Sequence, residues 1–160
     1  MVPKSTSRAR RRAGVPEPSS EEARNRMVAT RRADTQPELR LRSELHRMGL
    51  RFRLHRSVVP GVRRQIDIAF GTARVAVFVD GCFWHSCPQH ATAAKANAGF
   101  WRQKLADNQR RDRDTDLRLR KAGWRVVRVW EHEDARLAAR RIVRAVRPGL
   151  RALRGTRAEA

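Results

Sequence analysis

The chain has 160 residues and a formal net charge of +21 at pH 7, from 37 Lys and Arg residues against 16 Asp and Glu residues. This length suits one compact domain that buries a core without covalent cross-links. So large a positive charge favours a polyanionic partner, because each phosphate that a protein neutralises releases counterions. The charge does not indicate catalysis, since ribosomal and chromatin proteins share it.

The sequence predicts no secretory signal and no membrane partner. The opening residues, MVPKSTSRARRR, are basic, but the apolar run that a signal peptide requires does not follow them. No stretch is long and apolar enough to span a bilayer. We therefore expect a cytoplasmic protein in which Cys82 and Cys87 form no structural disulfide. Their spacing alone leaves two interpretations open, metal binding and a pair of buried thiols.

The N-terminal part of the chain predicts a basic tail and two helices. Residues 1–18 are rich in Arg, Pro and Ser and are expected to be disordered. A capping-box pattern at 19–22 predicts a short helix that runs toward Thr30. The segment 34–37 starts a second helix, with Pro in its first turn, and Gly49 closes it.

The remaining chain predicts four strands and two more helices. Residues 50–55 alternate apolar with basic or His side chains, which is typical of a half-buried strand. Two buried strands, 66–70 and 75–79, are joined by so short a turn at Gly71 that an antiparallel hairpin is expected. A helix at 100–121, a strand at 124–130, a basic helix at 134–146 and a frayed tail at 148–160 are expected to follow. This order indicates an α/β layer sandwich with a mixed sheet.

One carboxylate lies inside a predicted strand, and a second lies at the end of the next strand. Asp67 interrupts the apolar run Ile66-Asp67-Ile68, and Asp80 follows the next strand. Strand alternation allows Asp67 simply to face the solvent. The alternative is a site of carboxylate and carbonyl oxygens at a strand end, which are the ligands that Mg²⁺ prefers.

Residues 81–90 concentrate two Cys, two His and two large aromatic residues. Four nitrogen and sulfur ligands would close a tetrahedral structural zinc site. The ligands expected from the spacing are Cys82, Cys87, His90 and His132. His85 lies in the same loop and could replace one of them, whereas His46 and His55 are expected to be satisfied or exposed residues without a ligand role.

Aromatic residues suggest a surface for nucleic acid. Phe83 and Trp84 lie beside the expected ligands, and proteins that kink DNA insert such rings between base steps. The alternative is that these rings belong to the core, as we expect for Trp124 and Trp130.

Three residues share one face of the predicted long helix. Trp101, Lys104 and Asn108 recur at i, i+3 and i+7. The face would combine an intercalating ring, a cation and an amide able to read a base edge. The alternative is a solvated helix face with one half-buried Trp.

The segment from Phe78 to His85, FVDGCFWH, resembles the GCFWH core of the Vsr mismatch endonucleases. The resemblance covers residues 19–147 as one domain and leaves the tails 1–18 and 148–160 outside it. Supporting residues occur in matching order: Met27, Ala33 to Glu38, Phe100-Trp101, Asn108, Arg111-Asp112, Gly123 to Val126, and Val129 to Glu131.

The resemblance implies a restriction-endonuclease-like fold that carries a structural zinc ion. It implies that Asp67 is the metal-binding carboxylate and that the backbone carbonyl of Val79 shares the catalytic Mg²⁺. His85 would be the general base or would position the attacking water, and Glu38 would reach the site from the preceding helix.

The resemblance also implies the substrate, double-stranded DNA that contains a T:G mismatch from deaminated 5-methylcytosine. One strand would be nicked on the 5′ side of the T, which initiates very short patch repair. Phe83, Trp84 and Trp101 would form a wedge, Met27 would enter from the minor groove, and Lys104 and Asn108 would contact the mismatched pair. We expect a monomer, associated with the nucleoid and functionally linked to a cytosine-5 DNA methyltransferase.

The chain departs from the family pattern at two places. In the zinc loop, the family has His where this chain has Cys87 and Cys where it has Gln89, and His132 replaces a Cys. Ile66 replaces the Pro that usually precedes the catalytic Asp, inside a longer loop from 60 to 67 that could alter substrate preference.

Two alternative functions remain. A zinc-stabilised DNA-binding module without cleavage activity would not need Asp67 and His85. A basic RNA-binding protein would explain the charge but not the GCFWH segment.

Overall fold

A computed structural model describes residues 20–22, 25, 33–60, 64–90, 92–94 and 96–155, with side chains described as far as Pro148. The predicted N-terminal tail, Met27 and most of the predicted short helix lie outside the described residues.

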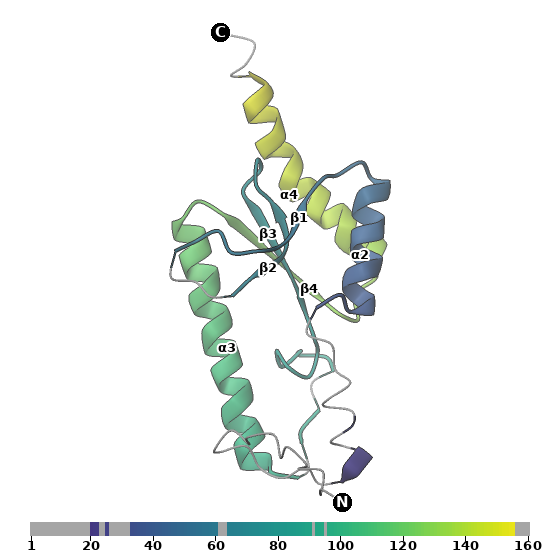
Figure 1. Ribbon diagram of the computed structural model, residues 1–160, viewed down its shortest axis with the longest axis vertical. Coiled ribbons are helices and arrows are strands. Elements are labelled where there is room, and N and C mark those ends of the chain that lie inside the picture. The colour runs from purple at the N-terminus through teal and green to yellow at the C-terminus, as the bar shows by residue number, and fades with distance from the viewer. Residues whose placement is uncertain are drawn as a thin grey trace, which may run out of the picture.

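A four-stranded mixed sheet forms the centre of the molecule (Figure 1). The strands lie in the order β1-β2-β3-β4; the first two neighbouring pairs are antiparallel, and β3 and β4 are parallel. Their bounds are β1 Arg53–Arg56, β2 Ile66–Phe70, β3 Val75–Asp80 and β4 Arg125–Trp130. The pairing of Phe70 with Val75 confirms the hairpin that the turn at Gly71 predicted.

Three helices complete the described fold: α2 Gln36–Arg47, α3 Ala98–Lys121 and α4 Ala135–Gly155. Helices α2 and α4 cover one face of the sheet and α3 covers the other (Figure 1). The mixed α/β layer sandwich is therefore confirmed, and it is consistent with a restriction-endonuclease-like fold. None of the helices in these ranges is long and apolar enough to cross a membrane.

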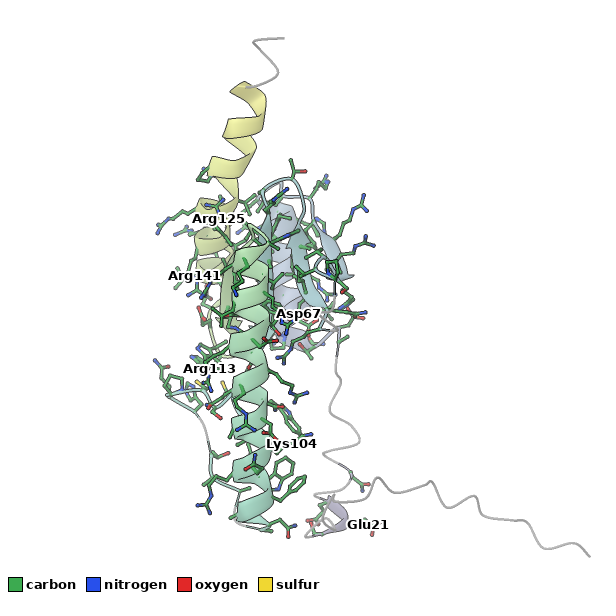
Figure 2. The ribbon with its side chains drawn as sticks, turned by 90° about the vertical axis from the view of Figure 1, so that its left-hand side faces the viewer. Glu21, Asp67, Lys104, Arg113, Arg125 and Arg141 are labelled. Carbon is green, nitrogen blue, oxygen red and sulfur yellow. The ribbon has the colours of Figure 1, made fainter. Side chains whose placement is uncertain are left out.

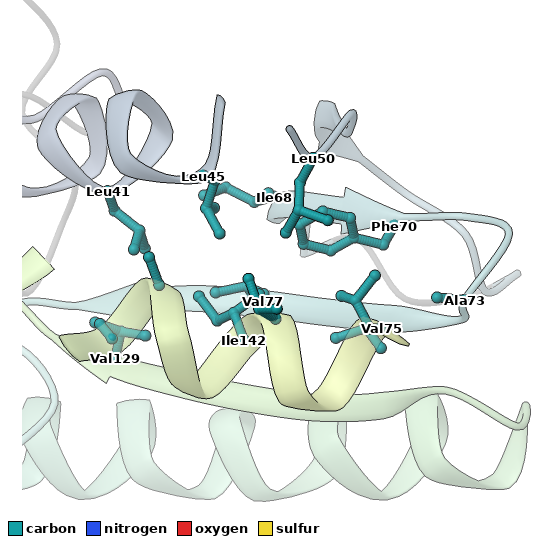
Figure 3. Packing of buried hydrophobic residues seen from close by; sticks show 14 residues of the cluster. Leu41, Leu45, Leu50, Ile68, Phe70, Ala73, Val75, Val77, Val129 and Ile142 are labelled. Atoms are coloured by element: carbon teal, nitrogen blue, oxygen red, sulfur yellow. The ribbon is translucent and has the colours of Figure 1, made fainter. Parts of the chain in front are cut away.

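The larger core lies between the sheet and the helices α2 and α4 (Figure 3). Leu41 and Leu45 of α2 and Ile142 of α4 are almost completely buried against Val77 and Ile68. Burying each such side chain contributes about 1.5–3 kcal/mol. The apolar residues of α2 and α4 are therefore spaced so that both helices bury them in the same core layer.

A smaller core lies under α3. It contains Ile66, Ala69, Ala76, Phe78 and Leu119. Because strand residues alternate between faces, Asp80 follows Phe78 on this same face of β3. The strand therefore ends with a buried carboxylate at the edge of an apolar layer.

Two boundaries differ from the sequence predictions. Strand β1 begins at Arg53, and Leu54 is 37% exposed, so the expected half-buried alternation is wrong there. Pairing with β2 skips His55, whose φ is 48°, because a left-handed residue interrupts the pleat. Helix α4 continues past Val146 and through Pro148, since the residues beyond are mostly good helix formers.

Candidate active site and candidate metal centre

A cleft of about 650 Å³ opens at the carboxyl end of β3. Its lining is mostly polar and comes from α2, the strands and the loop that follows β3. The lining residues are Ala33, Glu38, His55, Arg64, Gln65, Asp67, Phe78, Val79, Asp80 and His85. Asp67, Val79, His85 and Glu38, which the sequence assigned to catalysis, thus share one cavity.

Asp67 lies where strand pairing is interrupted opposite His55. Its carboxylate accepts a hydrogen bond from the Val79 N–H at 2.8 Å. Burial raises the pKa of Asp67 to about 6; the Val79 N–H opposes this rise, and the nearby carboxylates of Glu38 and Asp80 add to it. The side chain is half-buried and lines the cleft instead of facing bulk solvent.

Glu38 reaches the cleft from the first turn of α2 and is only 4% exposed. It accepts hydrogen bonds from the Thr35 hydroxyl at 3.0 Å, the Asp34 N–H at 3.1 Å and Arg42 at 2.8 Å. These bonds close the start of the helix, so Glu38 has a structural role besides any catalytic one.

Arg42 holds a group of potential ligands together. Side-chain atoms of Asp34, Glu38 and His55 lie within 4.8 Å of one another, close enough for a metal. The Arg42 guanidinium binds Asp34 and Glu38 and lies 3.4 Å from His55 Nε2. Its hydrogen bond, opposed by weaker desolvation, lowers the pKa of Asp34. The positive charge that this acidic group needs is therefore already present.

His85 is oriented by Asp112 of α3. The ring Nδ1 lies 2.6 Å from Asp112 Oδ2 and 3.5 Å from Asp80 Oδ1. Because an ionised carboxylate only accepts hydrogen bonds, Nδ1 carries the proton and Nε2 is left to exchange one. Burial acts to raise the pKa of Asp112, but His85, Arg64 and Arg128 outweigh it and lower that pKa below its usual value.

Asp112 matched the family pattern, but the sequence predicted no role for it or for the arginines around it. Asn108, Asp112, Thr115 and Leu119 are all buried and recur at helical spacing on α3. Asn108, Asp112 and Thr115 lie on the same face of α3 as the core residue Leu119. Polar residues on a buried face were a signal that this face contacts the site. Nothing in the spacing indicated which charges pair.

The Cys and His residues of the loop after β3 form a second cluster. Ligand atoms of Cys82, Cys87, His90 and His132 lie within 4.8 Å of one another. The measured pairs are Cys82 Sγ to His132 Nδ1 at 3.1 Å, Cys87 Sγ to His132 Nδ1 at 3.8 Å and Cys87 Sγ to His90 Nδ1 at 3.9 Å. Ligand atoms in a tetrahedral zinc site lie roughly 3.3–3.8 Å apart. The three distances lie close to that range, so the four groups are candidate ligands for one cation, and His85 lies with Asp112 instead of in this group.

The Cys82 thiol of this cluster is electrostatically unfavourable as an anion without a cation. Burial and the neighbouring Cys87 raise the pKa of Cys82 to about 11. The Cys82 N–H donates to the Glu131 carboxylate at 2.6 Å, which ties the loop to the end of β4. Trp124 is half-buried and packs against the smaller core, as expected, whereas Trp130 is half-buried and stacks on the His132 ring.

Three aromatic rings gather beside this loop. Phe83 lies 5.3 Å from both Trp84 and Trp101, and Trp84 lies 5.7 Å from Trp101, between ring centroids. All three are half-buried. The tertiary structure thus joins the loop pair to the helix residue that the sequence placed on a separate element.

Lys104 and Asn108 share the α3 face with Trp101 but differ in exposure. Lys104 is exposed on the part of α3 that extends beyond the sheet. It lies nearer to the start of this helix than Asp67 does (Figure 2). Asn108 is 7% exposed and donates to the Trp84 carbonyl at 3.0 Å. In the free protein Asn108 therefore holds Trp84, and its contact with a base pair stays a prediction.

Residues 18–90 match the model of the family described as DNA mismatch endonuclease Vsr. The chain is also 45% identical over 119 residues to the type II nicking enzyme V.NaeI of Lentzea aerocolonigenes, covering 73% of this chain and 72% of that protein. The chain belongs to the Vsr family.

Further relatives support membership of the Vsr family. The type II nicking enzyme V.XorIIP of Xanthomonas oryzae pv. oryzae is 40% identical over 123 residues, which cover 76% of this chain and 88% of that protein. The DNA mismatch endonuclease Vsr of Escherichia coli is 40% identical over 109 residues, which cover 66% and 65%. The resemblance seen in the GCFWH segment is therefore confirmed at the level of the family.

Proposed function

We propose that this Vsr-family chain is a DNA mismatch endonuclease that nicks one strand 5′ of the T in a T:G mismatch and so initiates very short patch repair. The observation that carries the proposal is one cleft that joins Asp67, Val79 and the His85–Asp112 pair, with three aromatic rings close by. The names of relatives as nicking enzymes support cleavage of a single strand.

The donor set at Asp67 fits Mg²⁺. Among the described residues, Oδ1 of Asp67 accepts no hydrogen bond, and no Arg or Lys forms an ion pair with the carboxylate. The raised pKa shows that this carboxylate lacks compensation for its charge. Asp67 and the Val79 carbonyl would hold the ion, which when bound would stabilise the charge that develops on the scissile phosphate.

His85 and Asp112 would supply the proton transfer. Nε2 of His85 would take a proton from the attacking water while Nδ1 remains bonded to Asp112. The Asp112 carboxylate would stabilise the imidazolium that forms. Glu38, already bonded to Arg42, would add negative charge at the edge of the cleft without giving up its hydrogen bonds to Asp34 and Thr35.

We propose zinc as the occupant of the Cys82, Cys87, His90 and His132 cluster, because two thiolates and two imidazoles satisfy tetrahedral zinc. The ion would stiffen the loop that carries Phe83, Trp84 and His85. Its role would be structural, since these four ligands leave no open position.

The aromatic triplet would separate the mismatched pair from its neighbour. Phe83, Trp84 and Trp101 already contact one another, so little conformational entropy opposes their insertion. Lys104 and Asn108 would face the mismatch, and Met27 would enter from the minor groove.

Exposed arginines would supply affinity for the backbone of double-stranded DNA. On α4, Arg136, Arg140, Arg144 and Arg147 are exposed and form no described ion pair. Phosphate contacts of this kind position the protein but do not read sequence. We further propose that the enzyme acts as a monomer at the nucleoid, functionally linked to a cytosine-5 DNA methyltransferase that creates the lesion-prone base.

The proposal is tested with purified protein, Mg²⁺ and end-labelled duplexes of one sequence, with either a T:G or a matched pair at the centre. We expect a single nick 5′ of the T only in the mismatched duplex. Binding without cleavage would support a DNA-binding module instead. Preference for structured RNA at equal salt would support an RNA-binding protein.

A further inference from the structure

Arg128 of β4 lies at the centre of a charged network that the proposed chemistry does not use. Its Nη1 donates to both oxygens of Asp80, at 2.8 and 2.7 Å. Its Nη2 donates to Asp116 of α3 at 2.8 Å and lies 3.5 Å from the backbone carbonyl of Asp112. One guanidinium thus ties the end of β3 to α3. Its central carbon, Cζ, lies 5.0 Å from the centroid of the Phe78 ring.

The bound carboxylate, Asp80, occupies a sensitive position. It follows Val79 directly, lines the same cleft as Asp67 and is only 3% exposed. An uncommitted carboxylate there would be a second oxygen ligand for a divalent cation. Arg128 occupies both of its oxygens and so satisfies a charge that would otherwise be buried without compensation.

The same guanidinium supports the orientation of His85. Arg128 contacts Asp112 and Asp116, which lie one helical turn apart on α3, and Asp112 holds His85 Nδ1. Asp80 lies 3.5 Å from the same nitrogen. Removal of Arg128 would therefore release two carboxylates around one imidazole.

We propose that Arg128 is a positioning residue that withholds Asp80 from the divalent cation and fixes the Asp112–His85 pair, so that Asp67 is the sole carboxylate that the cleft offers as a ligand among the described residues. This inference rests on the proposed function for the reaction, but it concerns the cation site and can be measured without DNA.

The test measures Mn²⁺ binding to the 160-residue protein, purified with zinc present, by electron paramagnetic resonance of free Mn²⁺. Arg128→Gln should bind Mn²⁺ about three- to tenfold more tightly, because a second carboxylate becomes available. The charge-balanced double variant Arg128→Gln/Asp80→Asn should return to within about threefold of the wild type, whereas Asp67→Asn should weaken binding by more than about tenfold.

A matched control is available on the surface of α3. Arg118 and Asp114 form an exposed ion pair, and Arg118→Gln/Asp114→Asn removes the same two charges without touching the cleft. This control should leave the Mn²⁺ affinity unchanged. In single-turnover nicking, the Arg128→Gln/Asp80→Asn protein should lose rate at unchanged affinity for mismatched DNA, since His85 loses its support.

The outcomes are distinguishable. If the double variant loses Mn²⁺ affinity as strongly as Asp67→Asn, then Asp80 is a ligand and the inference is overturned. An Arg128→Gln protein that binds Mn²⁺ no more tightly than the wild type overturns it too; if this variant does not fold, the double variant decides. A wild type that shows the expected Mn²⁺ pattern but nicks no mismatched DNA refutes the proposed function and leaves the inference standing.

Discussion

Two groups of side chains near the carboxyl end of β3 are candidate cation sites. They differ in the charges that surround them. In the cluster of Cys82, Cys87, His90 and His132, no Lys or Arg donates a hydrogen bond to a ligand atom within the part of the chain that the structure describes. In the acidic cleft, arginines pair with two of the three lining carboxylates: Arg42 binds Glu38, and Arg128 binds Asp80.

The difference shows that the number of acidic residues in a cleft is not the number of its metal ligands. A carboxylate paired with a buried guanidinium has its charge compensated and has little to gain from a cation. Asp67 stands apart because a single backbone N–H is its described partner. The candidate cation site is therefore indicated by the carboxylate that no described Arg or Lys pairs with.

The largest expected effect follows from removing that unpaired carboxylate. Asp67→Ala should lower the nicking rate on the order of a thousandfold, because several kcal/mol of charge stabilisation are lost. Affinity for mismatched DNA should change little, since it comes mostly from phosphate contacts. Single-turnover nicking and a binding titration check both, with Asp114→Ala on exposed α3 as the control. Normal turnover by a folded Asp67→Ala protein would place the cation site elsewhere.

In the Cys and His cluster, a substitution should lower the stability of the protein and not the rate of the chemical step. Cys87→Ser should lower the bound zinc well below one per chain and reduce Tm by roughly 10 °C, because metal binding contributes to folding. Elemental analysis and thermal denaturation measure these effects, and Ser86→Ala in the same loop is the control. Purified wild-type protein that contains no zinc by elemental analysis would refute this assignment.

A smaller effect is expected where the two regions meet, at the aromatic rings. Trp84→Ala should weaken binding to the T:G duplex about tenfold, since stacking contributes roughly 1–3 kcal/mol per base. Binding to the matched duplex and the salt dependence should barely change, because no phosphate contact is lost. Leu137→Ala, exposed on α4, controls for general loss of apolar surface. Equal weakening of both duplexes would show that Trp84 has no part in mismatch selection.

The smallest effect is the pH dependence that Asp67 gives to folding. Its pKa of about 6 lies above that of an unfolded Asp, so the folded state binds the extra proton between about pH 4 and 6. Stability from this group therefore falls as the pH rises through that interval. In Mg²⁺-free buffer, the stability that Asp67→Asn gains over wild type should be about 1 kcal/mol larger at pH 5 than at pH 4. Urea denaturation at both values measures this, and parallel pH curves would contradict it.

Local patterns in the sequence were sufficient for much of the fold. The short turn at Gly71 fixed the hairpin, and the spacing of Leu41 and Leu45 fixed the buried face of α2. The close spacing of Cys82, Cys87 and His90 named three residues that do lie together, and His132 joins them. The half-buried alternation expected around Leu54 failed, because the left-handed residue His55 interrupts β1 and no periodic pattern encodes such a break.

By itself the sequence determined the family, the candidate ligands and the aromatic residues, because each depends on residue type and on spacing within one element. The tertiary structure alone decided which charges are paired. Arg128 meets Asp80 from 48 positions away, and Asp112 meets His85 from 27. Such pairs depend on strand register and on the rotation of α3 about its axis, and a slip of one residue would turn every side chain away from its partner. Long-range packing, not local spacing, therefore left Asp67 as the one cleft carboxylate without an Arg or Lys partner among the described residues.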